Sequence, residues 1–245
     1  MKSLILAILS ILLNKALYAF EPHTANYQLS INGIKIAEEV RTLHKLEDKY
    51  FYTANAKTSG LAALVKDYSI SASSTFTIKE KGVDSINYQI MEQEDKKVTD
   101  NYAVDINSSN GIVSSILTKS QPKVVKWNTE KSNIVDPLSI FLAISFDLAN
   151  SSDESEFNYQ IADGKSIEQQ KFKKTENQVI KINNKEFNTI KVELINSNDN
   201  DIQAYFLSEY RYLPILIKRT KSGRDYVYEI NNFKISEIEK LQVTL

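Results

Sequence analysis

The chain of 245 residues contains no cysteine, and this absence removes several classes of protein at once. Disulfides and thiolate metal ligands are excluded, as is a bacterial lipoprotein, which needs a lipid-carrying cysteine at its cleavage site. Histidine is nearly absent as well, since His23 and His44 are the only two. A Ser-His-Asp triad or a histidine-rich metal site would have to use one of them. We therefore expect no enzyme, no metal site and no cofactor.

Charge of one sign is also lacking. The chain carries 30 lysine and arginine residues against 31 aspartate and glutamate residues, which gives a net charge of −1. Nucleic-acid binding normally leaves a basic patch, and the short cluster of Lys171, Lys173 and Lys174 is better explained as the solvated face of a strand. Carboxylates such as Glu38 and Glu39 are likewise interpreted as solvated surface. We expect no nucleic-acid partner.

The first 19 residues have the three parts of a secretion signal. Lys2 supplies a positive end, residues 4–13 form an apolar run that only Ser10 interrupts, and Ala19 is a small residue suited to the cleavage site. The run is too short to span a membrane, which takes about 20 residues, and no later segment is long and apolar enough. We expect cleavage near Ala19, export across the inner membrane to the periplasm, and a mature chain without an integral membrane span.

Beyond this signal, apolar and polar residues alternate with a period of two, as in half-buried strands. The stretch from Tyr68 to Ile78 is the longest clean example, and short connections separate about a dozen such stretches. Short connections favour antiparallel neighbours over β-α-β units. Residue pairs typical of tight turns stand at Asn32-Gly33, Asn110-Gly111, Asp163-Gly164, Asn183-Asn184 and Ser222-Gly223.

One apolar segment does not alternate. Asp136 is a favoured helix N-cap and Pro137 a favoured first helical residue, and apolar residues follow as far as Leu148. We predict a helix over 137–148, and because apolar residues occupy nearly its whole circumference, the helix should be buried. The sequence thus predicts one all-β dominated domain over 20–245, in which a curved antiparallel sheet or open half-barrel wraps around one buried apolar helix.

Several short pieces, taken in order, resemble one family of exported bacterial proteins. They are Tyr27-Gln-Leu-Ser-Ile-Asn-Gly33, Ala56-Lys-Thr-Ser-Gly-Leu61, Asp136-Pro-Leu-Ser139, Asp163-Gly-Lys165, Phe187-Asn-Thr-Ile-Lys-Val192, Tyr205-Phe-Leu-Ser208 and Leu213-Pro-Ile215. They are similar to pieces of the family called domain of unknown function 3108, which often has tryptophan at the position of Tyr205 and glycine at that of Glu186. The resemblance implies an envelope protein with a curved antiparallel sheet, similar in outline to the periplasmic lipoprotein carriers of the Lol system. It implies no catalytic residues.

A candidate binding surface combines one strand with the helix. Tyr68, Ile70 and Phe76 share a strand face by their even spacing, and the helix adds Phe141, Leu142 and Phe146. If sheet and helix leave a gap, these side chains line it, and the protein is a non-catalytic periplasmic carrier or chaperone for a hydrophobic or lipid-like ligand. If the six residues are plain core, the protein is instead an envelope-assembly partner with a filled core, which binds another protein through a strand edge. The sequence leaves both open.

Overall fold

The computed structural model describes residues 20–117, 123–151, 154–195, 200–235 and 242–244, so the predicted secretion signal lies outside the described residues. The helices are α1 (Gly60–Val65), α2 (Ile140–Asn150) and the short 3-10 helix η1 (Ser208–Tyr210). The strands are β1 (His23–Ile31), β2 (Ile34–Leu46), β3 (Lys49–Thr58), β4 (Tyr68–Lys79), β5 (Gly82–Glu94), β6 (Lys97–Asn107), β7 (Ile112–Leu117), β8 (Lys123–Asn128), β9 (Ile134–Val135), β10 (Glu156–Ala162), β11 (Ile167–Ile182), β12 (Lys185–Ile195), β13 (Asn200–Leu207), β14 (Leu213–Lys221), β15 (Arg224–Ile235) and β16 (Gln242–Thr244).

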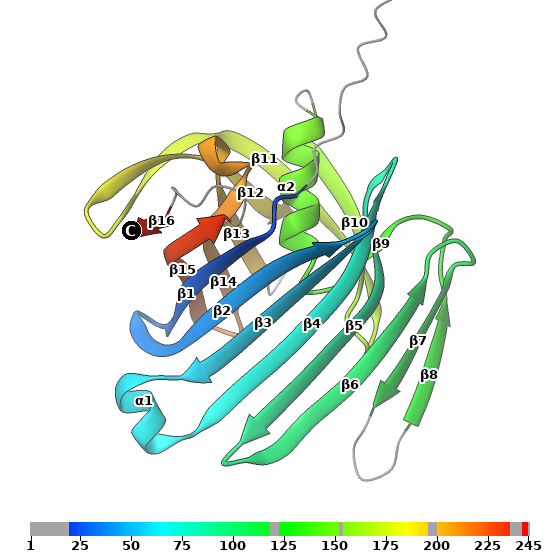
Figure 1. Cartoon of the computed structure of the whole chain (residues 1–245), viewed down its shortest axis with the longest axis horizontal. Helices are drawn as coiled ribbons and strands as arrows, with labels where there is room; N and C mark the ends of the chain where they lie inside the picture. The colour runs from blue at the N-terminus through cyan, green and yellow to red at the C-terminus, as the bar shows by residue number, and fades with distance from the viewer. Residues whose placement is uncertain (1–19, 118–122, 152–153, 196–199, 236–241, 245) are drawn as a thin grey trace, which may run out of the picture.

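All of these strands belong to one sheet (Figure 1). Strands β8 to β1 follow one another in the sheet, β1 then pairs with β15, and the order descends from β15 to β10 and ends at β9, while β16 adds to β15. The neighbours are antiparallel, except that β9 and β10 run parallel over two residue pairs. The prediction of an all-β chain built on one large antiparallel sheet is confirmed.

The described residues form 16 strands of this sheet, more than the dozen or so predicted. The strands that are hardest to recognise from alternation are β2, β8, β9 and β16. In β2 the period of two is hard to see because charged residues occupy both faces, with Glu38 and His44 exposed outside and Glu39 and Arg41 buried inside. The other three are short, at two to six residues.

The predicted turn pairs lie at tight connections between strands. Asn32 and Gly33 have φ angles of +49° and +79°, and Asn183 and Asn184 have φ angles of +46° and +69°. Two successive positive φ angles are the mark of the hairpin turn that matches strand twist, and asparagine and glycine tolerate them best. The local sequence therefore determines where the sheet folds back.

Helix α2 begins three residues later than predicted, at Ile140. Residues 137–139 form a turn, in which Asp136 Oδ1 accepts hydrogen bonds from the N–H groups of Leu138 and Ser139, both at 2.9 Å. Asp136 thus caps the segment as expected, although it does so one turn before the regular helix. The helix contacts β5, β10 and β14, which belong to both halves of the sheet, and Figure 1 shows the sheet curling around it.

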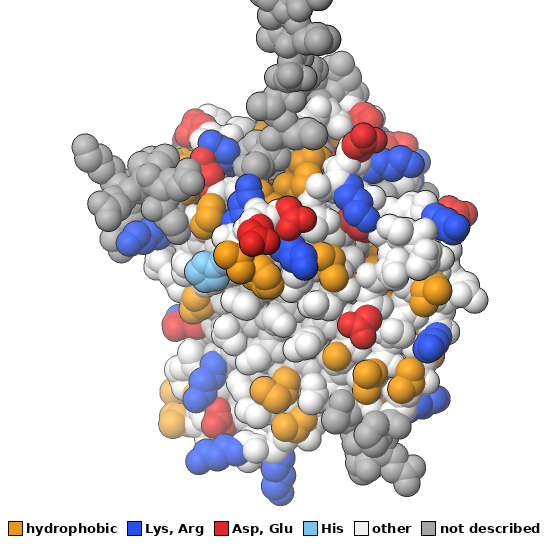
Figure 2. Space-filling model, turned by 45° about the vertical axis from the view of Figure 1, so that its right-hand side comes forward, with side chains coloured by type: hydrophobic (Ala, Val, Ile, Leu, Met, Phe, Trp, Pro, Cys, Tyr) orange, Lys and Arg blue, Asp and Glu red, His pale blue; other side chains and the backbone are white. Residues whose placement is uncertain are grey.

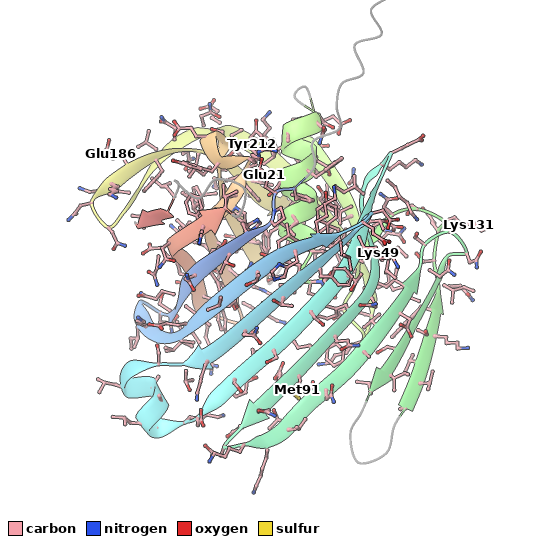
Figure 3. All side chains as sticks on the ribbon, viewed as in Figure 1. Glu21, Lys49, Met91, Lys131, Glu186 and Tyr212 are labelled. Carbon is pink, nitrogen blue, oxygen red and sulfur yellow. The ribbon has the colours of Figure 1, made fainter. Side chains whose placement is uncertain are left out.

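The main core lies between α2 and the concave face of the sheet. Phe20 is buried at its centre, with ring centroids 5.7 Å from Tyr50, 6.0 Å from Phe76 and 6.3 Å from Phe146. Tyr50 and Phe76 stack in parallel at 5.2 Å. This cluster joins the start of the described chain to β3, β4 and α2, so it fixes the helix inside the curl. Figure 3 shows side chains of both halves crowding around α2.

Side chains also hold the two ends of the curled sheet together. The turn between β10 and β11 reaches β6, where Lys165 Nζ lies 3.0 Å from Asp100 Oδ2. A Cβ atom on Gly164 would stand 2.6 Å from Tyr102 Cδ2 and 2.9 Å from Val104 Cγ2, so only glycine fits this close approach. The seam between the sheet ends is therefore closed by packing rather than by a continuous ladder of backbone hydrogen bonds.

The outer face of β3, β4 and β5 is polar but carries few charges. Outward positions hold residues such as Thr53, Asn55, Ser71, Ser73 and Asn87. Figure 2 shows a wide area of uncharged surface in the middle of one face, with charged side chains gathered above and below it.

Candidate functional site

A cleft of about 510 Å³ lies between the start of α2 and the inner face of the second half of the sheet. Its volume falls in the range of small-molecule sites, about 300–1,000 Å³. We call it the inner cleft; its lining residues are Arg41, Pro137, Ile140, Phe141, Ile161, Asp163, Glu168, Gln170, Phe172, Ile202, Ile217, Arg219, Lys221, Tyr226 and Tyr228.

One wall of the inner cleft changes from apolar to basic along its length. Ile217, Arg219 and Lys221 occupy alternate positions of β14, so they share the inner face of that strand. Tyr228 and Tyr226 of β15 stand directly opposite Ile217 and Arg219. Arg219 Nε donates a hydrogen bond of 2.7 Å to Asn200 Oδ1, which orients its guanidinium group. The wall is therefore apolar at the buried Ile217 and cationic toward the β14–β15 turn, where Arg219 and Lys221 lie.

The end of the inner cleft near α2 is apolar. Phe141 and Ile140 come from the first turn of the helix, and Phe172 and Ile161 face them from β11 and β10. Phe172 is buried. Phe141 is half-buried, because the Phe141 side chain borders the cleft instead of being enclosed by the core. Aliphatic and aromatic side chains of this kind stabilise a bound hydrocarbon chain by removing it from water.

The wall formed by β10 and β11 carries acidic groups. Asp163 Oδ1 accepts hydrogen bonds from the N–H groups of Lys165 and Ser166, at 2.8 and 2.7 Å, so this carboxylate stabilises its own turn. Glu168 Oε2 accepts a hydrogen bond of 3.2 Å from Gln170 Nε2. The inner cleft therefore has basic groups on one side and acidic groups on the other.

A buried ion pair forms one boundary of the inner cleft. Arg41 Nε donates to Glu39 Oε1, and the guanidinium carbon lies 4.9 Å from the ring centre of Tyr27 and 5.6 Å from that of Tyr228. Burial opposes the charge on Arg41, but the Glu39 carboxylate, followed by Tyr52 and Tyr27, raises its pKa above the ordinary value. Burial, followed by Glu39, raises the pKa of Tyr228. The arginine is held charged between two rings that are neutral at physiological pH.

The structure divides the six candidate residues among different places. Phe141 alone lines the inner cleft. Leu142 faces the other way, onto a cavity of about 30 Å³ that Phe20 and Ser145 also line. Phe76 and Phe146 are enclosed in the aromatic cluster around Phe20.

The remaining two candidates lie toward the opposite end of β4 from Phe76. Tyr68 begins the strand, where its hydroxyl donates to Glu92 Oε2. Ile70 is half-buried, and neither residue borders the inner cleft. Burial, followed by the hydrogen bond to Glu92, raises the pKa of Tyr68. Tyr68, Ile70 and Phe76 do share one face of β4, as predicted, but α2 covers only the half of that face that contains Phe76.

Sequence reasoning missed most of the inner cleft. The alternation of Ile217, Arg219 and Lys221, and that of Tyr226 and Tyr228, could have indicated inward-facing charges and rings. The interpretation of Glu39 as solvated surface is wrong, because the position lies on the inner face of β2, where Arg41 neutralises it. Alternation from the buried residues of the same strand would have revealed this orientation.

A buried carboxylate below α2 organises the local structure. Asp136 is fully buried, and its Oδ2 atom accepts hydrogen bonds from Ser74 Oγ at 2.5 Å, Ser85 Oγ at 2.6 Å and Ser139 Oγ at 2.9 Å. These bonds join β4, β5 and the turn before α2. All three hydroxyls donate to the carboxylate, so we assign Asp136 a role in stabilising the fold.

The two histidines lie apart from this group. His23 is buried, its Nδ1 lies 2.9 Å from the carbonyl oxygen of Glu21, and burial lowers its pKa. His44 is exposed on β2. Among the described residues, no group of three or more histidine, aspartate or glutamate side chains is placed to hold a metal ion. No helix in the described part of the chain combines the length and hydrophobicity needed to cross a membrane.

Comparisons with known proteins agree with this architecture. A comparison with curated proteins gave no match. The structure is similar to the crystal structure of a beta-barrel-like protein of domain of unknown function DUF1849 from Brucella abortus, with a TM-score of 0.62 and 9% sequence identity over 90% of this chain and 100% of that one. At this identity the likeness concerns the fold alone. The model of the family described as protein of unknown function DUF3108 matches residues 26–230. The chain therefore belongs to the DUF3108 family.

Proposed function

We propose that the protein is a non-catalytic binding protein for an amphiphile, a molecule with an apolar chain and a polar head. The observation that carries the proposal is the inner cleft of about 510 Å³, apolar near α2 and charged toward the β14–β15 turn. An assembly partner with a completely filled core, the alternative considered above, would have no such space. The cleft therefore favours a carrier or chaperone over an assembly partner.

The gradient along β14 suggests how the ligand lies. Its chain packs against Phe141, Phe172 and Ile217, while its head, bearing a carboxylate or phosphate, meets Arg219 and Lys221. Arginine binds such anions with several N–H groups at once. Arg41 forms a rigid boundary of the cleft and does not bind the head group, because it is already paired with the Glu39 carboxylate.

We place this function in the periplasm. The signal-like pattern of residues 1–19 supports export, and cleavage near Ala19 would leave Phe20 at or near the amino terminus. Phe20 is buried in the aromatic cluster, so a mature chain that begins there keeps its first side chain in the core. Cell fractionation and mass spectrometry of the amino terminus test this placement: an uncleaved chain in the membrane fraction contradicts it.

The proposal is tested by titrating the purified protein with a fluorescent fatty acid or lysophospholipid. We expect saturable binding at micromolar concentrations, weakened at least tenfold in Gln170→Trp. Gln170 is half-buried on the cleft side of β11, so an indole ring there fills part of the volume without emptying the core. Gln169→Trp is the matched control, because the neighbouring side chain points to the other face of the strand. Absence of binding in a folded parent, or equal loss in both variants, refutes the cleft as the site.

The head group is tested separately with probes that share one chain and differ in charge. Arg219→Met and Lys221→Met should weaken binding of an anionic probe by roughly tenfold each, since a hydrogen bond to a charged group contributes about 1.5–3 kcal/mol. A neutral probe should bind the variants like the parent. Lys218→Met, on the outer face of the same strand, is the control. Equal binding of anionic and neutral probes by the parent contradicts the assignment.

A further inference from the structure

Exposed aliphatic side chains gather at one end of the sheet. In α1, Leu61 and Leu64 are each 82% exposed and Val65 is 89% exposed. Ile34, next to the β1–β2 turn, is 70% exposed, and Val98, near the β5–β6 turn, is 52% exposed. Figure 1 places the β1–β2 turn, α1 and the β5–β6 turn along the same end. We call Ile34, Leu61, Leu64, Val65 and Val98 the apolar rim.

Helix α1 is firmly attached although it buries no side chain of its own. Before the helix, Ser59 N–H donates to the Ile36 carbonyl oxygen of β2 at 3.0 Å. At its end, Lys66 N–H closes the last turn by donating to the Ala62 carbonyl oxygen at 3.0 Å. Thr58 Oγ1 also accepts from Tyr68 N–H at 3.1 Å, which joins the strands on either side. The chain thus holds a Gly-Leu-Ala-Ala-Leu-Val segment in a defined position in which its large side chains point into solvent.

The charges around α1 nearly cancel. Lys66 Nζ lies 2.9 Å from Glu94 Oε1, and Lys57 Nζ lies 3.7 Å from Asp67 Oδ1. Another pair at this end, from Lys35 to Glu38, measures 2.7 Å. A neutralised border makes it less unfavourable for the end of the molecule to approach an apolar phase, and lysine stems add methylene groups to the surface.

The charged part of the inner cleft reaches this same end. Its residues Lys221 and Tyr226 flank the β14–β15 turn, and that turn is bonded to the β1–β2 turn: Asn32 N–H donates to the Asp225 carbonyl oxygen and Asp225 N–H to Asn32 Oδ1, both at 2.9 Å. Ile34 of the apolar rim begins β2 directly after that turn. The charged part of the cleft therefore lies beside Ile34, the rim residue at this edge, and the rest of the rim extends from there along the same end of the sheet.

We propose that the apolar rim docks on the surface of a lipid bilayer. The rim consists of separate protruding turns rather than one flat patch, as Figure 1 shows, and a fluid bilayer can accommodate each of them independently. Its position beside the inner cleft brings the cleft to the membrane, where amphiphiles are found. Docking does not depend on the proposed ligand, because none of the five rim residues lines the inner cleft.

The experiment is flotation of the purified, processed protein with vesicles of phosphatidylethanolamine and phosphatidylglycerol. The amino terminus is first verified by mass spectrometry, since a retained apolar signal would itself bind lipid. The parent should float with the vesicles, and the triple variant Leu61→Ser/Leu64→Ser/Val65→Ser should bind at least about 100-fold more weakly, because each aliphatic side chain contributes roughly tenfold. Raising the salt concentration should change binding by less than about threefold, because the surrounding charges are paired.

A matched control carries three serines at exposed aliphatic positions elsewhere, Val40→Ser/Leu46→Ser/Val179→Ser, and should bind vesicles like the parent. Failure of the parent to bind vesicles, or equal loss in both triple variants, overturns the proposal. Dimerisation of the parent that the rim variant abolishes, without vesicle binding, also overturns it and assigns the rim to a second copy. Binding of the fluorescent amphiphile in solution should be unchanged in the rim variant, so failure of docking and failure of the cleft are distinguished.

Discussion

Replacing Asp136 by alanine is the most direct test of how the sheet and α2 are joined. The carboxylate is fully buried and accepts five hydrogen bonds of 2.5 to 2.9 Å, two from backbone N–H groups and three from serine hydroxyls. Alanine leaves these donors without an acceptor in a site that water does not reach. A buried polar group without a partner costs about 1–3 kcal/mol. Ser85 Oγ lies 3.0 Å from Ser139 Oγ, so these two hydroxyls can pair with each other once the carboxylate is removed.

We therefore expect Asp136→Ala to lower the free energy of unfolding by about 3–5 kcal/mol, a large part of a typical total of about 5–15 kcal/mol. Asp136→Asn should lie between parent and alanine, since an amide oxygen can still accept the two backbone bonds. Urea unfolding followed by circular dichroism and by the fluorescence of Trp127 measures both. Asp105→Ala, at an exposed position of β6, is the control and should change stability by less than about 0.5 kcal/mol. A loss below about 1 kcal/mol in Asp136→Ala would refute the reasoning.

Two further predictions concern stability. Burial raises the pKa of Asp147 to about 6, although the hydrogen bond from Tyr159 acts in the opposite direction. Between pH 4 and 6 the folded chain therefore keeps a proton on Asp147 that the unfolded chain releases. The free energy of unfolding should fall by about 2–3 kcal/mol over this range as the pH rises. Asp147→Asn should remove this slope and raise the melting temperature at pH 7; an unchanged slope in urea titrations contradicts the assignment. Gly164→Ala should lower stability by about 2–4 kcal/mol, because its φ of +87° and the Tyr102 ring both oppose a Cβ atom. Gly223→Ala, with φ of +72° and open space around it, should lower stability by only about 1 kcal/mol, and equal losses would show that the seam contact contributes nothing.

Local signals in the sequence were sufficient for much of the fold. Turn pairs such as Asn32-Gly33 and Asn183-Asn184 marked the hairpins because few other residues accept two successive positive φ angles. Clean alternation from Tyr68 to Ile78 gave β4 within one residue of its observed end. The start of α2 was misplaced because Asp136 caps an irregular turn first, which its N-cap preference alone cannot reveal.

The candidate site was harder to predict because it depends on contacts between distant parts of the chain. Periodicity placed Tyr68 and Phe76 on one strand face, but it could not tell which half of that face α2 would cover. Arg41 reaches Tyr228 only because β1 joins β2 to β15, a contact between residues nearly two hundred positions apart. Sheet curvature, which opens the inner cleft, results from the sum of such pairings.

The position of β1 between β2 and β15 also has a consequence for how the chain reaches its native state. The first described strand, His23–Ile31, pairs along its whole length with β15, Arg224–Ile235. A strand near the beginning of the chain therefore has no partner on that side until a strand near the end is available. Until β15 is available, β1 is an edge strand with unpaired N–H and C=O groups. If the chain is exported as we propose, it emerges amino end first and cannot complete this sheet before residue 235 has crossed the membrane. The arrangement thus couples final folding to the arrival of nearly the entire chain, and it delays folding of the same chain during synthesis, when β15 is made last.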